Sequence, residues 1–149
     1  MNNSSAVAQN INTFFEIYSK ALESHDSKTI VFLHQIPCTM LSDDAYTIFS
    51  DASKLEGFFN QGMAFYRQFG IVTVRADIWH KINITKKIAR VRVNWQFFDS
   101  NNAPVYNCDY QYVLKADKHN HWRIVLSISV NEKERMEDWK AKKQPVVNS

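Results

Sequence analysis

The chain is poor in the residues that interrupt, cross-link or anchor a fold. Its 149 residues include three glycines, three prolines and two cysteines, which excludes collagen-like, low-complexity and disulfide-rich classes. No apolar run approaches the roughly 18 residues of a membrane span, and the N-terminus lacks a basic segment followed by an apolar one. We therefore predict a cytoplasmic protein in which Cys38 and Cys108 are reduced and buried as small apolar side chains.

The composition is that of one globular domain. Hydrophobic residues make up 45% of the chain and charged residues 22%, with a formal net charge of +3 at pH 7. Part of this mild positive excess comes from lysines close to the C-terminus, so it does not indicate a nucleic-acid partner. We predict a disordered N-terminus at residues 1–5, one domain at residues 6–131, and a short C-terminal helix with a mobile tail at residues 132–149.

Two helices are predicted in the first quarter of the chain. A stripe of apolar residues at helical spacing predicts a first helix that starts after Ser4 or Ser5, either of which can cap its free N–H groups. Asp26 predicts the start of a second, short helix over residues 27–34. Pro37 prevents this helix from continuing, because proline lacks the N–H that a helix interior needs.

A small hairpin and a third helix follow. Residues 39–41 and 46–49 are typical of two short strands joined by a turn. Ser50 or Asp51 is the predicted cap of the third helix, and Gly70 is its predicted left-handed end.

Four long segments then alternate apolar and polar residues, at 71–84, 88–98, 104–116 and 121–130. This alternation predicts antiparallel strands with one dry face against the helices and one polar outer face. The predicted dry face includes His80, Trp95, Cys108, Tyr110, Leu126 and Ile128. The predicted outer face includes Arg75, Asp77, Arg92, Asp109, Ser127 and Ser129.

This order of helices, hairpin and long strands resembles the nuclear transport factor 2-like cone fold, which includes ketosteroid isomerase and SnoaL-like polyketide cyclases. Asp26 and Pro37 bracket the second helix, and Trp122, Arg123 and Ile124 are similar to a Trp-Arg-Ile strand common in the group. The resemblance covers about residues 6–131. It implies an α+β fold with three N-terminal helices packed into a strongly curved, mixed or antiparallel sheet, and a homodimer formed through the outer sheet face.

The resemblance also implies a pocket for a small apolar ligand. The predicted pocket residues are Tyr18, Cys38, Phe59, Met63, Tyr66, His80, Trp95, Cys108 and Tyr110. His80 could act as a general acid or base, and Tyr18 could donate its hydroxyl to a ligand oxygen, as the helix-one tyrosine of ketosteroid isomerase does. No cofactor, metal, nucleic acid or membrane partner is predicted.

The chain departs from the isomerase pattern, and this leaves three functions open. The segment Pro37-Cys38-Thr39-Met40 holds no carboxylate, and none lies on the predicted dry face of the long strands. The first function is ligand binding by a SnoaL-like or ketosteroid isomerase-like protein, with catalysis unproven. The second is a noncatalytic dimeric module. The third is an enzyme that resembles limonene epoxide hydrolase and uses Arg75, Asp77 and Asp109 to activate water.

Overall fold

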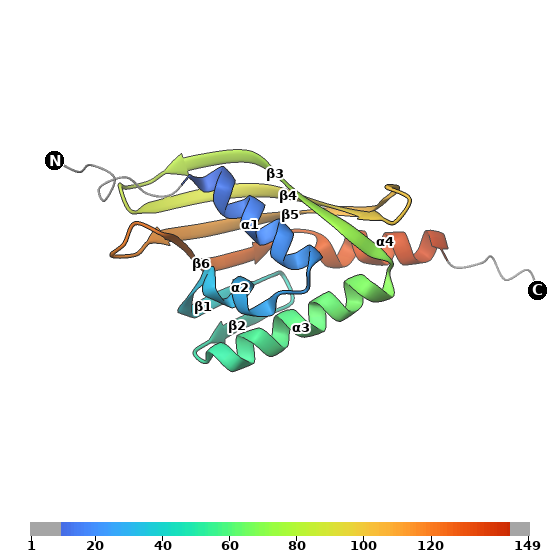
Figure 1. Cartoon of the computed structure of the whole chain (residues 1–149), viewed down its shortest axis with the longest axis horizontal. Helices are drawn as coiled ribbons and strands as arrows, with labels where there is room; N and C mark the ends of the chain where they lie inside the picture. Colours follow the sequence, from blue (N-terminus) through green and yellow to red (C-terminus); the bar gives the residue numbers. More distant parts are fainter. Residues whose placement is uncertain (1–9, 144–149) are drawn as a thin grey trace, which may run out of the picture.

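A computed structural model describes residues 10–143, and in it a curved sheet wraps around helices (Figure 1). The strands are β1 (His34–Leu41), β2 (Tyr46–Phe49), β3 (Ile71–Asn83), β4 (Ile88–Asp99), β5 (Pro104–Ala116) and β6 (Trp122–Ser129). The helices are α1 (Ile11–Glu23), α2 (Ser27–Phe32), α3 (Ala52–Gln68) and α4 (Glu132–Lys143). The predicted disorder of residues 1–5 and the predicted mobility of the tail beyond residue 143 lie outside the described residues.

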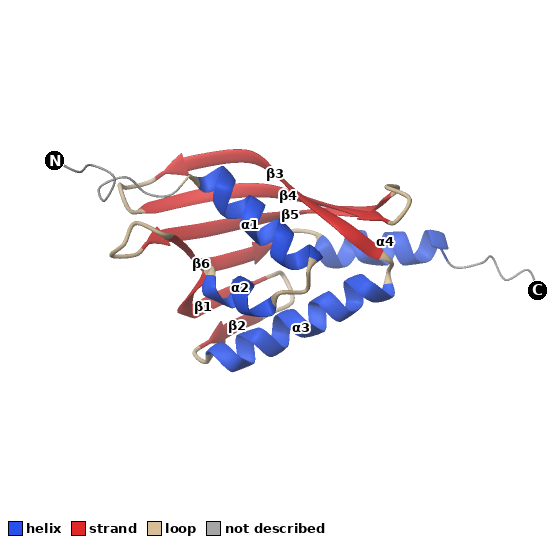
Figure 2. Cartoon of the chain, in the orientation of Figure 1, coloured by secondary structure: helices blue, strands red, loops and turns tan. Residues whose placement is uncertain are grey.

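The strands form one six-stranded sheet in the order β2-β1-β6-β5-β4-β3. β1 and β6 run parallel and every other neighbouring pair is antiparallel, so the sheet is mixed. Figure 2 shows α1 lying across the sheet, with α2 and α3 beside the β1–β2 hairpin. The predicted α+β cone is confirmed, and a fourth helix, α4, follows the last strand.

Three helices begin at a polar residue whose side chain accepts a backbone hydrogen bond. Asn10 caps α1, Asp26 caps α2 and Asp51 caps α3, with oxygen-to-nitrogen distances of 2.7, 3.1 and 2.8 Å. Asp26 is the predicted cap, and Asp51 is one of the two predicted for α3. Because Asn10 takes this role, α1 begins at Ile11, later than predicted; Ser4 and Ser5 lie outside the described residues.

The dry interior lies between the helices and the concave face of the sheet. Val91 and Val93 of β4 are fully buried there. The arginines that precede them in the sequence, Arg90 and Arg92, are exposed. Phe14 of α1 is also fully buried in this core. The predicted sidedness is therefore correct in β4, because strict alternation places successive side chains on opposite faces.

A bulge in β3 reverses the predicted alternation near its end. Ile78 pairs with Val93, but the next pair is His80 with Arg92, so Trp79 is an extra residue on β3. His80 consequently lies on the outer face beside Arg92 and is exposed. The prediction that His80 faces the interior is wrong for this reason.

A second irregularity reverses the two faces of β6. Leu114 of β5 pairs with Ile124, and the preceding residue Val113 pairs with Leu126, so Val125 is the extra residue. Beyond it, Ser127 and Ser129 face the interior, opposite tyrosines of β5. The predicted inward placement of Leu126 and Ile128, and the outward placement of the two serines, are therefore wrong.

Candidate functional site

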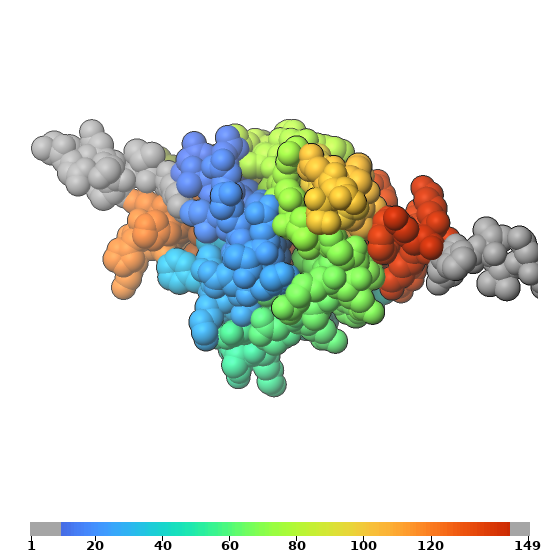
Figure 3. Space-filling model, turned by 45° about the vertical axis from the view of Figure 1, so that its right-hand side comes forward, coloured from blue at the N-terminus to red at the C-terminus, as the bar shows by residue number. Residues whose placement is uncertain are grey.

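A cavity of about 410 Å³ lies inside the cone, within the range of roughly 300–1,000 Å³ that small-molecule sites occupy. Its wall combines residues of α1, α3 and α4 with residues of every strand except β3, and most of these residues are apolar or aromatic. Six of the predicted pocket residues line it: Tyr18, Phe59, Met63, Tyr66, Trp95 and Tyr110. In the space-filling view, α1 (blue) and α3 (green) both lie on the visible face, and α4 (red) lies at one end (Figure 3).

The other three predicted pocket residues do not line this cavity. Cys38 of β1 and Cys108 of β5 are buried, but neither is among the residues that line the cavity. Burial raises the pKa of the Cys38 thiol to about 11, and burial followed by the charge of Glu132 raises that of Cys108, so both thiols stay protonated. His80 is exposed on the outer face, so the structure does not bring it together with Tyr18 in one site.

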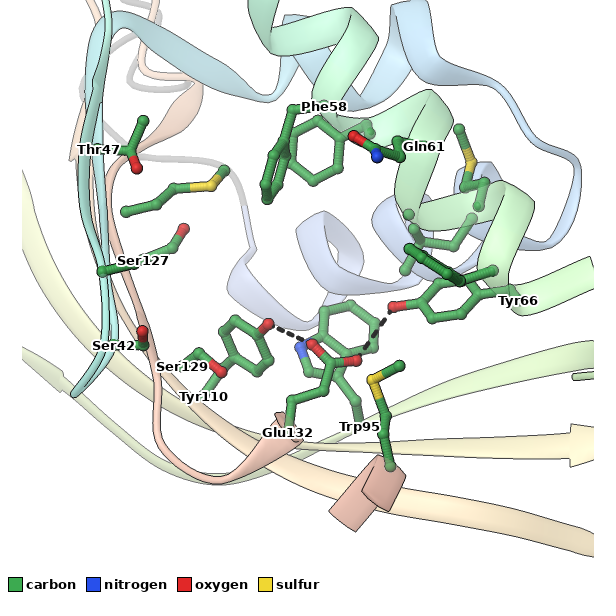
Figure 4. Close-up of a pocket in the computed structure, with 18 of the residues that line it drawn as sticks. Ser42, Thr47, Phe58, Gln61, Tyr66, Trp95, Tyr110, Ser127, Ser129 and Glu132 are labelled. Carbon is green, nitrogen blue, oxygen red and sulfur yellow. Dashed lines mark hydrogen bonds between the residues drawn. The ribbon is translucent and has the colours of Figure 1, made fainter. Parts of the chain in front are cut away.

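A carboxylate that the sequence analysis missed reaches into the cavity. Oε1 of Glu132 accepts a hydrogen bond of 2.5 Å from the hydroxyl of Tyr110. Oε2 of Glu132 accepts hydrogen bonds from Tyr106 at 2.8 Å and from Tyr66 at 3.5 Å. Figure 4 shows Glu132 between Tyr110 and Tyr66 at the wall of the cavity. We call this arrangement of Glu132, Tyr66, Tyr106 and Tyr110 the Glu132 cluster.

The place where β6 ends explains how Glu132 reaches the cavity. The pairing of β6 with β5 stops at Ser129, opposite Tyr110, so the earlier part of β5 has no strand on this side. The chain stays beside β5 there, because Val130 donates its N–H to the carbonyl of Asp109 at 3.0 Å. The side chain of Asn131 accepts the N–H of Asp109 at 2.8 Å. α4 thus starts at the edge of the sheet, with Glu132 aimed inward.

The tyrosines of the Glu132 cluster are held in their protonated form. Burial, followed by the negative charge of Glu132, raises the pKa of Tyr66, Tyr106 and Tyr110 well above the usual value. Each phenol therefore keeps its single O–H, and each O–H points to Glu132. Three donors stabilise the charged carboxylate at the border of an apolar cavity.

Tyr18 lies in a second aromatic group of the wall. Its ring contacts Trp95 with a centroid distance of 5.0 Å, and Trp95 donates its indole N–H to the hydroxyl of Tyr112 at 2.7 Å. Burial, then the charge of Glu132, raises the pKa of Tyr18 well above its usual value. Tyr18 can therefore act as a hydrogen-bond donor or acceptor toward a bound molecule, and its catalytic role stays a prediction.

The Arg75, Asp77 and Asp109 set lies on the outer face of the sheet. Asp77 is exposed and accepts the indole N–H of Trp79 at 2.9 Å. Asp109 is buried beneath α4 and accepts amide N–H groups of Asn94 and Asn131, both at 3.0 Å. Arg75 packs over the ring of Phe98 instead of binding either carboxylate. The three side chains therefore do not meet at the cavity.

A helical spacing in the sequence groups Glu132 with two apolar residues, although it does not show that this side of the helix reaches the cavity. Glu132, Met136 and Trp139 follow the i, i+4, i+7 repeat, which places them on one side of a helix. Met136 lines the cavity and Trp139 packs on the ring of Phe69 at a centroid distance of 4.9 Å. The spacing indicates that Glu132 lies on the side of α4 that packs against the rest of the protein.

The described residues offer neither a metal centre nor a membrane helix. Within residues 10–143, no three His, Cys, Asp or Glu side chains gather closely enough to hold a metal ion. In the same part of the chain, no helix combines the length and the apolar character needed to cross a bilayer.

Comparison with known proteins places the sequence in a family. Residues 6–132 match the family described as "NTF2-like protein (DUF6841)". No match was found among curated proteins.

Several solved structures share the fold. An NTF-2 like protein of unknown function from Shewanella oneidensis has a TM-score of 0.58 at 11% identity, covering 80% of this chain and 95% of that one. A domain of unknown function with a cystatin-like fold from Nostoc punctiforme has a TM-score of 0.66 at 9% identity, covering 91% and 85%. A ketosteroid isomerase-like protein from Erwinia carotovora atroseptica has a TM-score of 0.58 at 10% identity, covering 87% and 97%. At these identities the likeness establishes the fold alone.

Proposed function

Because the chain belongs to the NTF2-like protein family described as DUF6841, whose fold encloses a pocket, we propose that it binds a small, mostly apolar molecule in this cavity. The proposal rests on the cavity, which has a volume of about 410 Å³ and has aromatic and methionine side chains over most of its wall. Apolar walls with a few convergent polar groups are typical of small-molecule sites. The Glu132 cluster supplies such polar groups.

The cavity also bears on the alternative of a noncatalytic dimeric module with a filled pocket. Such a module would have its interior occupied by the large side chains Phe59, Trp95 and Tyr110. These side chains instead line the open space without closing it. The proposal is limited to binding and includes no reaction, since His80 is exposed on the outer face, away from Tyr18.

Two glycines of α3 give a matched test of this proposal. Gly62 lines the cavity, whereas Gly57 is exposed, and a Cβ added at either position meets no atom within 4 Å. Leucine at position 62 would therefore fit the helix but extend into the cavity. Titration with the neutral dye Nile red, followed by its fluorescence, should show that Gly62→Leu weakens binding by about tenfold or more. Gly57→Leu should bind as the unmodified protein does.

Two results would contradict this proposal. The first is an unmodified protein that does not enhance the fluorescence of Nile red. The second is equal binding by the Gly62→Leu and Gly57→Leu variants, because the dye would then sit outside the cavity. Circular dichroism of both variants checks that their helix content is unchanged.

A further inference from the structure

We propose that the ligand of this cavity carries a protonated amine, and that Glu132 binds the amine while the aromatic wall holds the apolar part. This inference rests on the proposed binding function and names the chemical class of the ligand. Three features of the Glu132 cluster and its surroundings carry it: the direction of its hydrogen bonds, the unpaired charge of Glu132, and the aromatic rings beside it.

The direction of the hydrogen bonds makes this end of the cavity a region of acceptors. Tyr66, Tyr106 and Tyr110 each have one O–H, and all three are donated to Glu132. What remains for a ligand are the lone pairs of the carboxylate and of the two phenols that line the cavity, Tyr66 and Tyr110. A ligand group with N–H donors is complementary to such a surface, whereas a carboxylate or a ketone offers only acceptors.

The charge of Glu132 has no cationic partner among residues 10–143. None of the ion pairs in this part of the chain includes Glu132. Arg135, one helical turn away, instead donates to the side chain of Asn107 at 2.7 Å and lies 4.0 Å from Asp109. An ammonium group in the cavity would therefore provide the opposite charge that the protein itself does not supply.

Aromatic rings on the same cavity wall favour a cation as well. Tyr18, Tyr66, Trp95 and Tyr110 all line the space into which Glu132 projects. The faces of such rings attract an ammonium group within about 6 Å, most strongly when water is excluded. The other polar side chains of the wall, such as Ser127, carry hydroxyl or amide groups. These groups can both donate and accept hydrogen bonds, so they do not favour a ligand of either charge.

The inference is tested with three ligands of one shape and three charges. Isothermal titration calorimetry near neutral pH compares naphthylmethylamine, which is a cation, with neutral naphthylmethanol and with anionic naphthylacetic acid. A hydrogen bond between charged partners is worth enough to make the amine bind about ten- to hundredfold more tightly than the alcohol. The acid should bind most weakly, because its carboxylate faces the carboxylate of Glu132.

Two variants of α4 test whether the preference for the amine depends on the charge at position 132. Glu132→Gln removes the charge with little change of shape, and should abolish the preference for the amine while naphthylmethanol still binds. Glu134→Gln makes the same change on an exposed side chain two residues along the helix and should keep the preference. If Glu132→Gln does not fold, the order amine, alcohol, acid in the unmodified protein still decides the question.

The possible failures of this experiment are separable. Equal binding of the amine and the alcohol, or a preference that survives in Glu132→Gln, overturns the amine inference. If Gly62→Leu weakens naphthylmethanol binding in that case, the cavity remains a binding site for neutral ligands. If no naphthyl compound binds, the amine inference fails, and the Nile red titration with Gly62→Leu and Gly57→Leu decides separately whether the cavity binds an apolar molecule.

Discussion

The buried imidazole of His34 should make the stability of this protein fall as the pH drops below about 6.5. His34 opens β1 and is 3% exposed, with its ring packed against Phe59 at a centroid distance of 5.1 Å. Its Nδ1 lies 2.7 Å from the carbonyl oxygen of Ile30, so Nδ1 carries the proton of the neutral ring. Its Nε2 is buried and has no hydrogen-bond partner among the described residues. A second proton would therefore place a charge and an unsatisfied N–H in the core.

The size of the effect follows from the pKa of His34. Burial lowers this pKa from 6.5 to about 4, against which the hydrogen bond to Ile30 acts only partly. Each pKa unit corresponds to about 1.4 kcal/mol, so keeping His34 neutral in the folded core contributes about 3 kcal/mol to the free energy of unfolding. Protonation of His34 in the unfolded chain removes this contribution as the pH falls. The folded pKa is the lower one, so this stability is fully present above pH 6.5 and is lost as the pH falls to about 4.

Urea unfolding followed by tryptophan fluorescence measures this loss. The free energy of unfolding is determined for the unmodified protein, His34→Asn and His119→Asn at several pH values from about 7 to about 4. Asparagine can still donate to the carbonyl of Ile30 but does not titrate, so the His34→Asn profile should be flatter than that of the unmodified protein by about 3 kcal/mol over this interval. His119 is exposed in the turn before β6, and its replacement should leave the profile unchanged. Parallel profiles for the unmodified protein and His34→Asn would refute the reasoning.

Two further predictions concern a helix cap and the outer sheet face. Asp51→Ala should lower the free energy of unfolding by about 1 kcal/mol in urea, because the cap of α3 is lost, whereas the neighbouring Ser50→Ala should not; equal losses would contradict the assignment of the cap. The homodimer expected through the outer face is tested by Arg92→Glu, since Arg92 is exposed there over the ring of Trp79. Sedimentation should shift toward the monomer in Arg92→Glu but not in Arg67→Glu on α3, and an unchanged sedimentation coefficient would count against this face as the interface.

Local chemistry explains which parts of the fold were predictable. Asp26 and Gly70 were identified correctly because a cap and a left-handed helix end depend on residues next to each other in the chain. The sidedness of β4 was correct because its valines and arginines alternate without interruption. The cavity residue Tyr18 follows from the helical spacing of apolar residues in α1. Trp95 and Tyr110 follow from the alternation of apolar and polar residues in β4 and β5.

The parts that failed depend on the register of pairing with a neighbouring strand, which the pattern within one strand does not fix. The bulge at Trp79 exists only in relation to β4, and the one at Val125 only in relation to β5. One extra residue changes the face of every residue that follows, and this moved His80 outward and Ser129 inward. No local pattern records such a shift.

By itself, the sequence determined the order of the elements, the dry side of the regular strands and the aromatic character of the interior, because periodicity and capping act over a few residues. Only the tertiary structure decided that the cavity contains a carboxylate. Glu132 faces inward because β6 ends beside an unpaired stretch of β5, and α4 occupies that edge. The site thus depends on where two neighbouring strands stop pairing, which is a property of the assembled sheet and not of any one segment.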